Sequence, residues 1–300
     1  MPQKKLIVRL KGGLGNQLFS YAASRRLSIV NNAELVIDDV TGFKRDFEYK
    51  RNYSLDNFNI PSRKATSKEL LEPLGLIRRK LFKYRERLKS FKNRIYIEQE
   101  FPDFDSRLIG LKFDGNCYID GLWQSEGYFI DIDDVIREDL KINPPLDTEN
   151  QELARMIKSK NAVGIHVRRF SKSDESTVNL ANIYYSEAIK ITQKELHDPC
   201  YVVFSDDIEY ARSVFEALKI EAFYVNHNIL DANAYADLWL MSMCKHFIVA
   251  NSTFSWWGAW LGGNQDSRLI FFPRLVSLDK AHWAWDYKNQ MPKNWRAIGI

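Results

Sequence analysis

The stretch KLIVRLKGGLGNQLFSYAAS, residues 5–24, joins a short apolar run to a helical pattern through a glycine-rich turn. Gly12, Gly13 and Gly15 let a strand turn sharply into a helix and bring bare backbone N–H groups to an anion at the helix N-terminus. A dinucleotide-binding turn requires G-x-G-x-x-G, but the third glycine position, counted from Gly13, holds Leu18. The turn predicts a βα unit and leaves open whether it holds a dinucleotide, another nucleotide or no ligand.

Two carboxylates keep the dinucleotide interpretation open. Asp38 and Asp39 end the next apolar run, ELVIDD, about where a ribose-binding carboxylate would lie. A hydride-transfer enzyme is therefore one alternative at this point.

The composition is that of an ordinary globular protein. The chain has 300 residues, 45% hydrophobic and 27% charged, a length that suits two domains of roughly 150 residues each. Its three cysteines are scattered and show no CxxC spacing, which supports neither a disulfide framework nor a zinc site. The N-terminal apolar run is too short for a signal peptide, and no run reaches the roughly 18 apolar residues of a membrane span. We therefore expect a cytoplasmic protein.

A proline pair predicts a domain boundary. Pro144 and Pro145 in INPPL cannot continue a helix, which gives an N-terminal domain 1–143 and a C-terminal domain 144–300. After this boundary, apolar runs alternate with stretches of helical period. The runs are AVGIHV, YVVFS, AFYV, HFIVA and RLIFF, and the helical stretches lie around 184–196, 208–218, 234–244 and 254–261. Such alternation is typical of a parallel sheet covered on both faces, with ligands at the carboxyl ends of the strands.

One of these strand ends carries candidates for binding a diphosphate. In GIHVRRF, strand alternation puts His166 and Arg168 on one side and Arg169 on the other. Guanidinium groups match phosphate oxygens bidentately and stay charged at any working pH. Surface arginines that form ion pairs are the alternative.

The next strand ends in VFSDD. Ser205 can cap the following helix with Asp206 and Asp207 in its first turn, where the helix dipole favours anions. A metal site is the weaker alternative, because two adjacent aspartates differ from the D-x-D spacing of metal-dependent sites. We therefore expect no bound metal.

The densest pattern is YADLWLMSMCKHFIVANSTFSWWGAWL, residues 235–261. After the strand HFIVA, the hydroxyl groups of Ser252, Thr253 and Ser255 crowd a helix N-terminus, where they and backbone N–H groups could hold phosphate. Three tryptophans follow in this helix and predict buried core, with a platform for a sugar ring as the alternative: Trp256, Trp257 and Trp260.

A basic stretch, RRKLFKYRERLKSFKNR at residues 78–94, contains nine Lys or Arg and one Glu. Apolar residues at spacings of 4, 3, 4 and 3 predict one stripe on a helix whose other faces are basic: Ile77, Leu81, Tyr84, Leu88 and Phe91. The helix either packs by this stripe on its own domain or contacts an anionic partner. A membrane surface is favoured over nucleic acid, because the rest of the chain shows no nucleic-acid-binding motif.

Five segments occur along the chain in one order: VRLKGGLGNQLFSYAAS, GLWQSEGYF, HVRR, FSDD and the 237–261 stretch. Together they resemble the bacterial α-1,2-fucosyltransferases of glycosyltransferase family 11. The resemblance implies two Rossmann-like α/β domains that face a cleft, the glycosyltransferase B type of fold, with the acceptor on the N-terminal side and GDP-fucose on the C-terminal side. The glycine turn then belongs to the acceptor side, and no dinucleotide is expected.

The resemblance also implies an activity. It is the inverting transfer of L-fucose from GDP-β-L-fucose to the 2-hydroxyl of a terminal galactose, without a metal or other cofactor. We expect this galactoside 2-α-L-fucosyltransferase to act in the synthesis of a surface polysaccharide such as O-antigen, on a galactose-terminated, lipid-linked glycan, at the inner face of the membrane.

Site residues follow from the same resemblance. Arg168 at the diphosphate and Asn16 near the transferring fucose are the expected catalytic residues. The expected donor-binding residues are His166 at the guanosine, Asp237 at the guanine edge, and Ser252, Thr253 and Ser255 along the phosphates.

The chain departs from the family in one place. The family commonly continues H-x-R-R with Gly-Asp, whereas this chain has Phe170 and Ser171. If the missing aspartate takes the acceptor's proton, its role falls to Asp174 or Glu175, or to a phosphate oxygen of the donor. The departure also keeps open an alternative of another class, an inactive transferase-like protein that binds sugar or serves as a scaffold.

Overall fold

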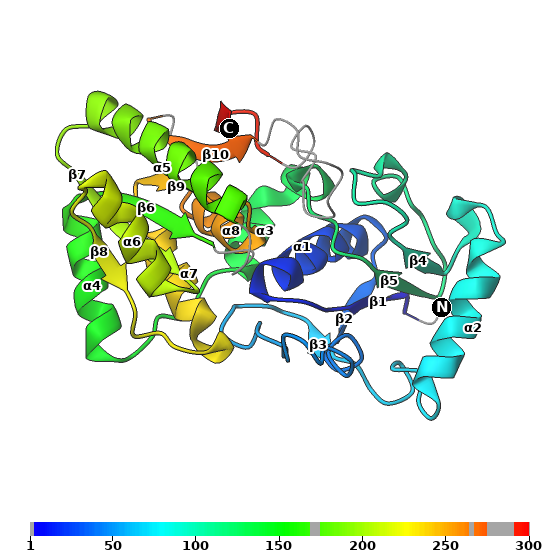
Figure 1. The fold of residues 1–300 in the computed structure, drawn as a ribbon. Helices are drawn as coiled ribbons and strands as arrows, with labels where there is room; N and C mark the ends of the chain where they lie inside the picture. Colours follow the sequence, from blue (N-terminus) through cyan, green and yellow to red (C-terminus); the bar gives the residue numbers. More distant parts are fainter. Residues whose placement is uncertain (1–2, 169–174, 264–266, 275–290, 300) are drawn as a thin grey trace. The chain divides into compact units, whose positions relative to one another are not determined.

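The computed structural model describes residues 3–168, 175–263, 267–274 and 291–299, with the backbone alone for 175–182. The chain divides into two compact units (Figure 1). The N-terminal unit runs to Asn143 and also includes Met291, and the C-terminal unit begins at Pro144. Each unit contains its own parallel sheet.

The N-terminal unit has a sheet in the order β3-β2-β1-β5-β4, in which every neighbouring pair is parallel. Its strands are β1 (Lys5–Arg9), β2 (Glu34–Asp38), β3 (Arg63–Lys64), β4 (Tyr96–Glu98) and β5 (Asn116–Asp120), and its helices are α1 (Leu14–Val30), α2 (Gly75–Arg87) and α3 (Asp133–Asp139). The order reverses between β1 and β5, because β2 and β3 extend the sheet on one side of β1 and β5 pairs on the other. This pair is the topological switch point of the unit, where α/β sheets bind ligands.

The C-terminal unit has a parallel sheet in the order β11-β10-β9-β6-β7-β8. Its strands are β6 (Asn161–Val167), β7 (Pro199–Ser205), β8 (Phe223–Val225), β9 (His246–Ile248), β10 (Ile270–Arg274) and β11 (Arg296–Gly299). Its helices are α4 (Thr148–Ser159), α5 (Glu175–Glu195), α6 (Ile208–Leu218), α7 (Ala234–Ser242) and α8 (Thr253–Leu261). Here the order reverses between β6 and β9.

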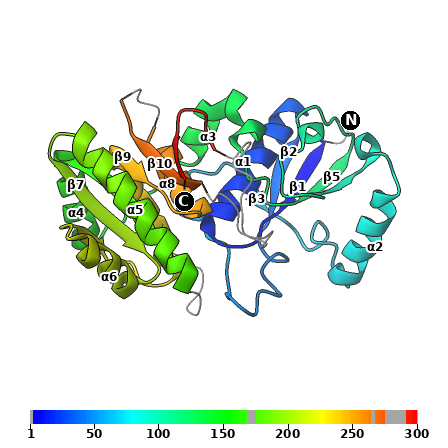
Figure 2. The ribbon, with the colours of Figure 1, turned by 45° about the horizontal axis from the view of Figure 1, so that its top comes forward.

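The predicted alternation of strands and helices after residue 144 is confirmed. Alternate residues of β6, β7, β9 and β10 pack against α5 and α6 in one continuous core, and Figure 2 shows these two helices on one side of the sheet. α5 is also tied to the strand ends. The hydroxyl of Tyr185 donates to the carbonyl of His166 at 2.8 Å, and that of Tyr184 lies 2.7 Å from the carbonyl of Val249.

The tryptophans of α8 are core, as predicted. Trp256 and Trp257 are fully buried and Trp260 is 5% exposed. Trp256 and Trp260 stack with ring centroids 6.1 Å apart, and Trp257 meets Trp260 edge to face. The packing of these buried rings holds α8, and with it the N-terminus of the helix, in a fixed position.

The basic helix differs from the prediction in length and orientation. α2 ends at Arg87, and the apolar stripe from Ile77 to Leu88 faces away from the protein. The buried side chains of α2 are instead Arg79 and Glu86. The interpretation that the helix packs by its stripe on its own domain is therefore wrong. The inward face instead carries charged side chains that find partners there, together with the ring of Phe82, which contacts the rings of Tyr96 and Tyr118.

None of the described helices is long and apolar enough to cross a bilayer.

Candidate functional site

The switch point of the C-terminal unit brings together the ends of two strands. His166 is the last residue but one of β6, and Arg168 follows the strand directly. On the neighbouring side, β9 leads through a short turn to α8, which begins at Thr253. The imidazole of His166 meets the ring of Phe254 in the first turn of α8, with ring centroids 5.4 Å apart. Two predicted site segments thus lie side by side.

His166 is held in a neutral form. Its side chain is almost completely buried, and Nδ1 has no hydrogen-bond partner among the described residues. Burial, together with the positive charge of Arg168, lowers the pKa of His166 to about 3. A buried polar atom without a partner costs free energy that a ligand can recover by pairing with it. His166 is thus suited to form a hydrogen bond to a ligand.

Arg168 is oriented by the next strand. Its Nε lies 3.4 Å from Oδ2 of Asp206, which follows β7, and the side chains of Arg168 and Asp206 are 29% and 42% exposed. The ion pair predicted as an alternative for this arginine is therefore present. It leaves the guanidinium at the carboxyl edge of the sheet, beside His166.

The predicted cap after β7 is wrong in detail. Asp207, not Ser205, is the N-cap of α6, and its carboxylate accepts a hydrogen bond from the backbone N–H of Tyr210 at 3.0 Å. Ser205 is still the last residue of β7, so it cannot be the N-cap. Asp206 and Asp207 connect the strand to α6. The hydroxyl of Ser205 accepts from the N–H of Asp207 at 3.0 Å. This shift leaves Asp206 outside the helix and able to reach Arg168.

The N-terminus of α8 presents an anion-binding arrangement. Ser252 is the N-cap with an extended backbone, and its side chain forms no capping bond to the described helix. Ser252 and Thr253 are half-buried, so their hydroxyls and the first N–H groups of the helix can reach a ligand. Ser255 differs from them: it is fully buried, and its hydroxyl lies 3.2 Å from the carbonyl of Ser252. In this structure it closes the turn from inside, and its contact with phosphate stays a prediction.

Asp237, in the first turn of α7, has a perturbed carboxylate. Burial raises the pKa of Asp237 to about 7, against the opposing effect of a hydrogen bond from Asn228, whose Nδ2 lies 2.8 Å from Oδ1 of Asp237. Asn228 also donates to Asn150 on α4 at 2.9 Å, and His227 lies 3.1 Å from the same Asn150 oxygen. Sequence reasoning missed Asn228 and its contact with Asn150, because no local pattern links these two residues, which lie 78 positions apart in the chain.

The general-base candidates lie at the edge of what is described. Asp174, and Arg169 before it, fall outside the described residues. Glu175 begins α5, and its side chain is likewise outside the described part. Their roles stay predictions.

Asn16 lies in the N-terminal unit, at the switch point between β1 and β5. Its Oδ1 accepts from Nε2 of Gln124 at 2.8 Å, which joins the first turn of α1 to the segment after β5. Gly12 has φ +75°, and a Cβ there would lie 2.8 Å from the Asn16 amide nitrogen. Gly13 is the N-cap of α1 and has no side chain to occupy the helix N-terminus. The glycine at position 12 thus leaves room for the Asn16 side chain.

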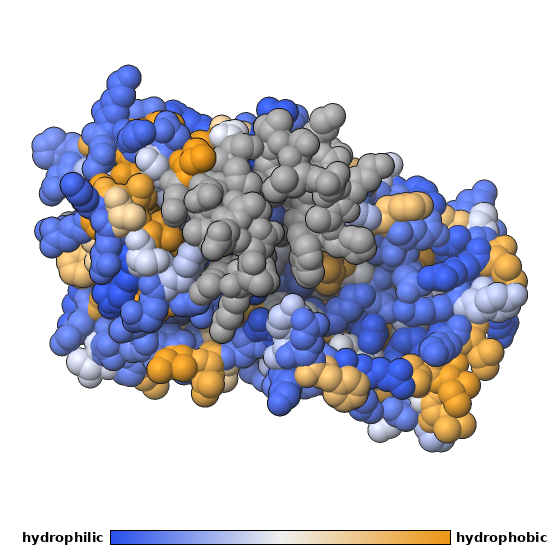
Figure 3. All heavy atoms as spheres, in the orientation of Figure 1, coloured by the Kyte–Doolittle hydropathy of each residue, from blue (hydrophilic) through white to orange (hydrophobic). Residues whose placement is uncertain are grey.

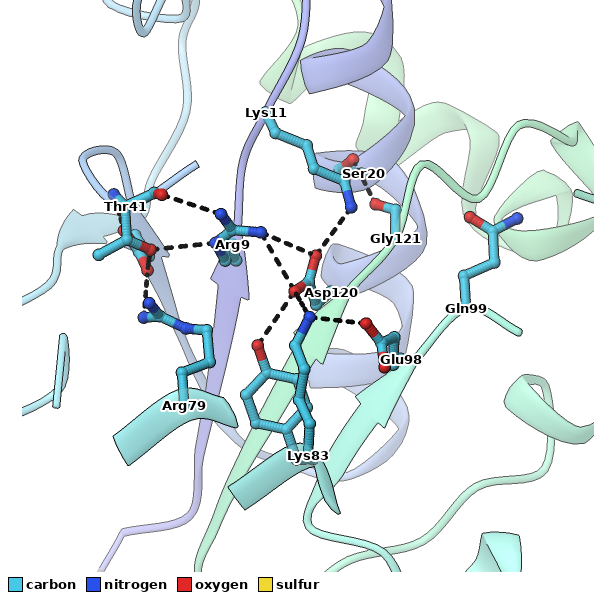
Figure 4. Close-up of polar contacts among 12 residues, drawn as sticks. Arg9, Lys11, Ser20, Thr41, Arg79, Lys83, Glu98, Gln99, Asp120 and Gly121 are labelled. Atoms are coloured by element: carbon cyan, nitrogen blue, oxygen red, sulfur yellow. Dashed lines mark hydrogen bonds and ion pairs between the residues drawn. The ribbon is translucent and has the colours of Figure 1, made fainter. Parts of the chain in front are cut away.

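A buried carboxylate organises the same edge of the sheet (Figure 4). Asp120 ends β5, is 1% exposed, and lies 2.9 Å from Lys11, 2.8 Å from Lys83 and 3.2 Å from Arg9. The hydroxyl of Tyr96 donates to it at 3.0 Å. Burial alone would raise the pKa of Asp120, but the three cations hold this pKa well below its usual range. Asp120 is therefore a fixed anion that positions Lys11 beside the glycine turn.

The two carboxylates on which the dinucleotide interpretation depends are engaged within the protein. Oδ2 of Asp39 lies 3.5 Å from Nζ of Lys64. Asp38 is almost fully buried and accepts hydrogen bonds from the backbone N–H and the hydroxyl of Thr41. Its second oxygen also pairs with Arg79 at 3.2 Å. With its lone pairs occupied in this way, Asp38 holds the turn after β2 and cannot receive a ribose.

Comparison with known proteins agrees with these observations. Glycosyl transferase family 11 matches residues 5–298. An alpha-1,2-colitosyltransferase of Escherichia coli is 33% identical over 266 residues, which cover 85% of this chain and 87% of that protein. The O-antigen biosynthesis glycosyltransferase WbnK of E. coli is 30% identical over 292 residues, or 88% of this chain and 92% of that one.

Among solved structures, the fold is similar to that of the fucosyltransferase NodZ from Bradyrhizobium. The TM-score is 0.53 at 16% identity, over 87% of this chain and 94% of that one. From the match over almost its entire length and its two relatives of similar size, the chain belongs to glycosyl transferase family 11.

Proposed function

We propose that the protein is an inverting α-1,2-glycosyltransferase that uses a GDP-linked 6-deoxy-L-hexose. The donor sugar is L-fucose or colitose, which is L-fucose without its 3-hydroxyl, and the acceptor is the 2-hydroxyl of a terminal galactose. The names of the relatives support this range: one is a colitosyltransferase, one acts in O-antigen biosynthesis, and more distant ones are galactoside alpha-(1,2)-fucosyltransferases. We place the reaction in O-antigen assembly on a lipid-linked glycan.

One observation carries the proposal. In a chain of this family, the ring of buried His166 packs against Phe254 in the first turn of α8, and Nδ1 of this histidine has no partner among the described residues. Arg168 directly follows the same strand, β6, at the switch point of the C-terminal sheet. In the proposed glycosyltransferase B arrangement, this unit binds the donor and the N-terminal unit binds the acceptor. Asp237 and neutral His166 receive the guanosine, and Arg168 with Ser252 and Thr253 receives the diphosphate.

The proposed chemistry follows from this placement. The galactose 2-hydroxyl attacks the anomeric carbon opposite the diphosphate, and the sugar–oxygen bond to GDP breaks as the new glycosidic bond forms. Negative charge grows on the leaving diphosphate, and donors already fixed toward it stabilise the transition state. Asn16 orients the sugar. The hydroxyl proton passes to Asp174, Glu175 or a phosphate oxygen. Positive charge comes from Arg168 and the helix N-terminus, without a metal.

The direct test is turnover of the purified full chain with GDP-fucose and GDP-colitose, on an array of galactose-terminated acceptors with EDTA present. We expect transfer from one donor, unaffected by EDTA, with an α-1,2 linkage in the product by NMR. A site that hydrogen-bonds the 3-hydroxyl should reject colitose strongly, because its polar group would be left unpaired. If the protein shows no transfer and no hydrolysis of the donor, the inactive scaffold is favoured. If EDTA abolishes turnover and Mn²⁺ restores it, the metal-free mechanism is refuted.

Arg168→Lys tests the diphosphate contact. Lysine keeps the charge but lacks the planar fork, so it cannot hold two phosphate oxygens in fixed geometry. We expect kcat to fall by about 10²–10³, as for loss of one transition-state donor, with weaker GDP binding and unchanged thermal unfolding. Arg155→Lys, at an exposed position of α4, is the matched control. Equal turnover in the two variants would contradict the assignment.

Asp237 gives a pH dependence. Its carboxylate must be ionised to accept from a guanine edge, and its pKa of about 7 leaves it largely protonated at pH 6. GDP should therefore bind about tenfold more weakly at pH 6 than at pH 8 and release a proton near pH 6. Calorimetry in buffers of different ionisation enthalpy measures both effects. Asp237→Asn should lower GDP affinity and abolish the proton release.

The carboxylate of Asp237 also makes the stability of the protein depend on pH, but in the opposite direction to GDP binding, which strengthens as the pH rises. The pKa of Asp237 lies above the unfolded value of about 3.9, so the folded chain keeps a proton that the unfolded chain loses between about pH 4 and 7. Stability of the unliganded protein should therefore fall as the pH rises through this range, and Asp237→Asn should raise its Tm at pH 8. Glu152→Gln removes an exposed charge from α4 as the control. A variant that loses both stability and GDP affinity would point to a purely structural role.

A further inference from the structure

α2 presents its hydrophobic side chains to solvent. Ile77, Leu81, Tyr84 and Leu88 are 54%, 60%, 67% and 75% exposed. Their spacing of 4, 3 and 4 residues places them in one line along the helix, which we call the outer stripe. Figure 3 shows hydrophobic side chains gathered at the edge of the N-terminal unit where Figure 1 draws α2. Large apolar residues aligned in this way on a surface mark an interaction site.

The inward face of α2 fixes this orientation. Arg79 pairs with Asp38 at 3.2 Å, and Lys83 pairs with Glu98 at 2.6 Å and with Asp120. One turn further on, Oε2 of Glu86 accepts from the backbone N–H of Ile95 at 2.7 Å. Turning the outer stripe inward would break all these contacts and leave buried charges without partners, which is strongly unfavourable. The exposure of the stripe is therefore built into the fold.

Cations lie along both sides of the outer stripe. At 100° per residue, Lys80 lies on one side of it and Arg85 on the other. Both are exposed, and neither forms an ion pair within the part of the chain that is described here. We call Lys80 and Arg85 the basic border. Other cations of the helix, Arg79 and Lys83, are by contrast occupied on the inward face.

We propose that α2 is a peripheral docking helix for an anionic lipid surface. A helix of 13 residues is about 20 Å long and too short to span a bilayer. Lying in the interface, it would bury the outer stripe among the acyl chains while the basic border met lipid phosphates. Long Lys and Arg side chains reach the headgroups from beside an apolar strip. The inference goes beyond the proposed function and does not depend on it.

Charge favours lipid over a second copy of the chain. If two outer stripes packed on each other, the cations on both borders would face cations of the partner. Like charges in close contact oppose association, whereas an anionic bilayer matches both borders at once. An acidic protein partner and a second copy are therefore outcomes that the experiment must separate.

The test is co-sedimentation of the full chain with vesicles of phosphatidylcholine alone and with 30% phosphatidylglycerol. We expect binding to the anionic vesicles, weakened as ionic strength rises. Lys80→Glu with Arg85→Glu should lower the partition coefficient at least about thirtyfold, the loss expected for two cations at an anionic surface. Leu81→Ser with Leu88→Ser should abolish binding at any salt concentration. Thermal unfolding of both variants should match wild type.

Matched pairs elsewhere serve as controls. Lys158→Glu with Lys194→Glu makes the same charge change on α4 and α5, and Leu146→Ser with Ile229→Ser removes two leucine-sized side chains that are 96% and 68% exposed. Both should bind vesicles like wild type. Equal binding by all variants, or no binding by wild type, would overturn the proposal. So would a wild-type dimer in analytical ultracentrifugation that the outer-stripe variant converts to a monomer, because the stripe would then be a dimer contact.

Discussion

A parallel strand order that reverses once is the constraint on which both units depend. Each strand of a parallel sheet is reached by a crossover, so the loops that leave the carboxyl ends all emerge at one edge. Where the order reverses, two neighbouring loops diverge and leave space between them. In the C-terminal unit this happens between β6 and β9, and in the N-terminal unit between β1 and β5. His166, Arg168 and the N-terminus of α8 lie at the first of these places, and Asn16 lies at the second.

Polar groups at these edges fall into two kinds, distinguished by how fully they are paired. Asp120 has three cations and a tyrosine hydroxyl around it, and its pKa is low. Among the described residues, Asp237 accepts one side-chain hydrogen bond, from Asn228, and its pKa is raised to about 7. Nδ1 of His166 has no partner among the described residues. Fully paired groups hold the fold together, whereas buried groups left short of partners are typical of binding sites.

The sequence predicted what depends on local periodicity. The strands and helices after residue 144 and the positions of His166 and Arg168 follow from alternation and spacing, and the motifs were enough to indicate the family. Apolar periodicity failed at α2, where it identified the stripe but not the direction in which the stripe points. That direction depends on Asp38, Glu98 and Asp120, which lie on other elements and hold the charged face inward. Ion pairs between distant residues leave no periodic trace in a sequence.

The same limit applies within the candidate site. Asn228 and Asn150 bond to each other across 78 residues of chain, and no motif marks either one. The cap at Asp207 could not be separated from one at Ser205, because the choice depends on where β7 ends. Sequence patterns thus located the site segments, and tertiary contacts decided the electrostatic state of their side chains.

The central claim is that the C-terminal unit binds a GDP-linked sugar at the β6/β9 switch point. The most direct measurement is a crystal structure of the full chain soaked with GDP. The account predicts the diphosphate between Arg168 and the N-terminus of α8, with the guanine edge on the carboxylate of Asp237 and a ligand atom within hydrogen-bond distance of Nδ1 of His166. GDP bound instead at the glycine turn beside Asn16, with the β6/β9 edge empty, would contradict it.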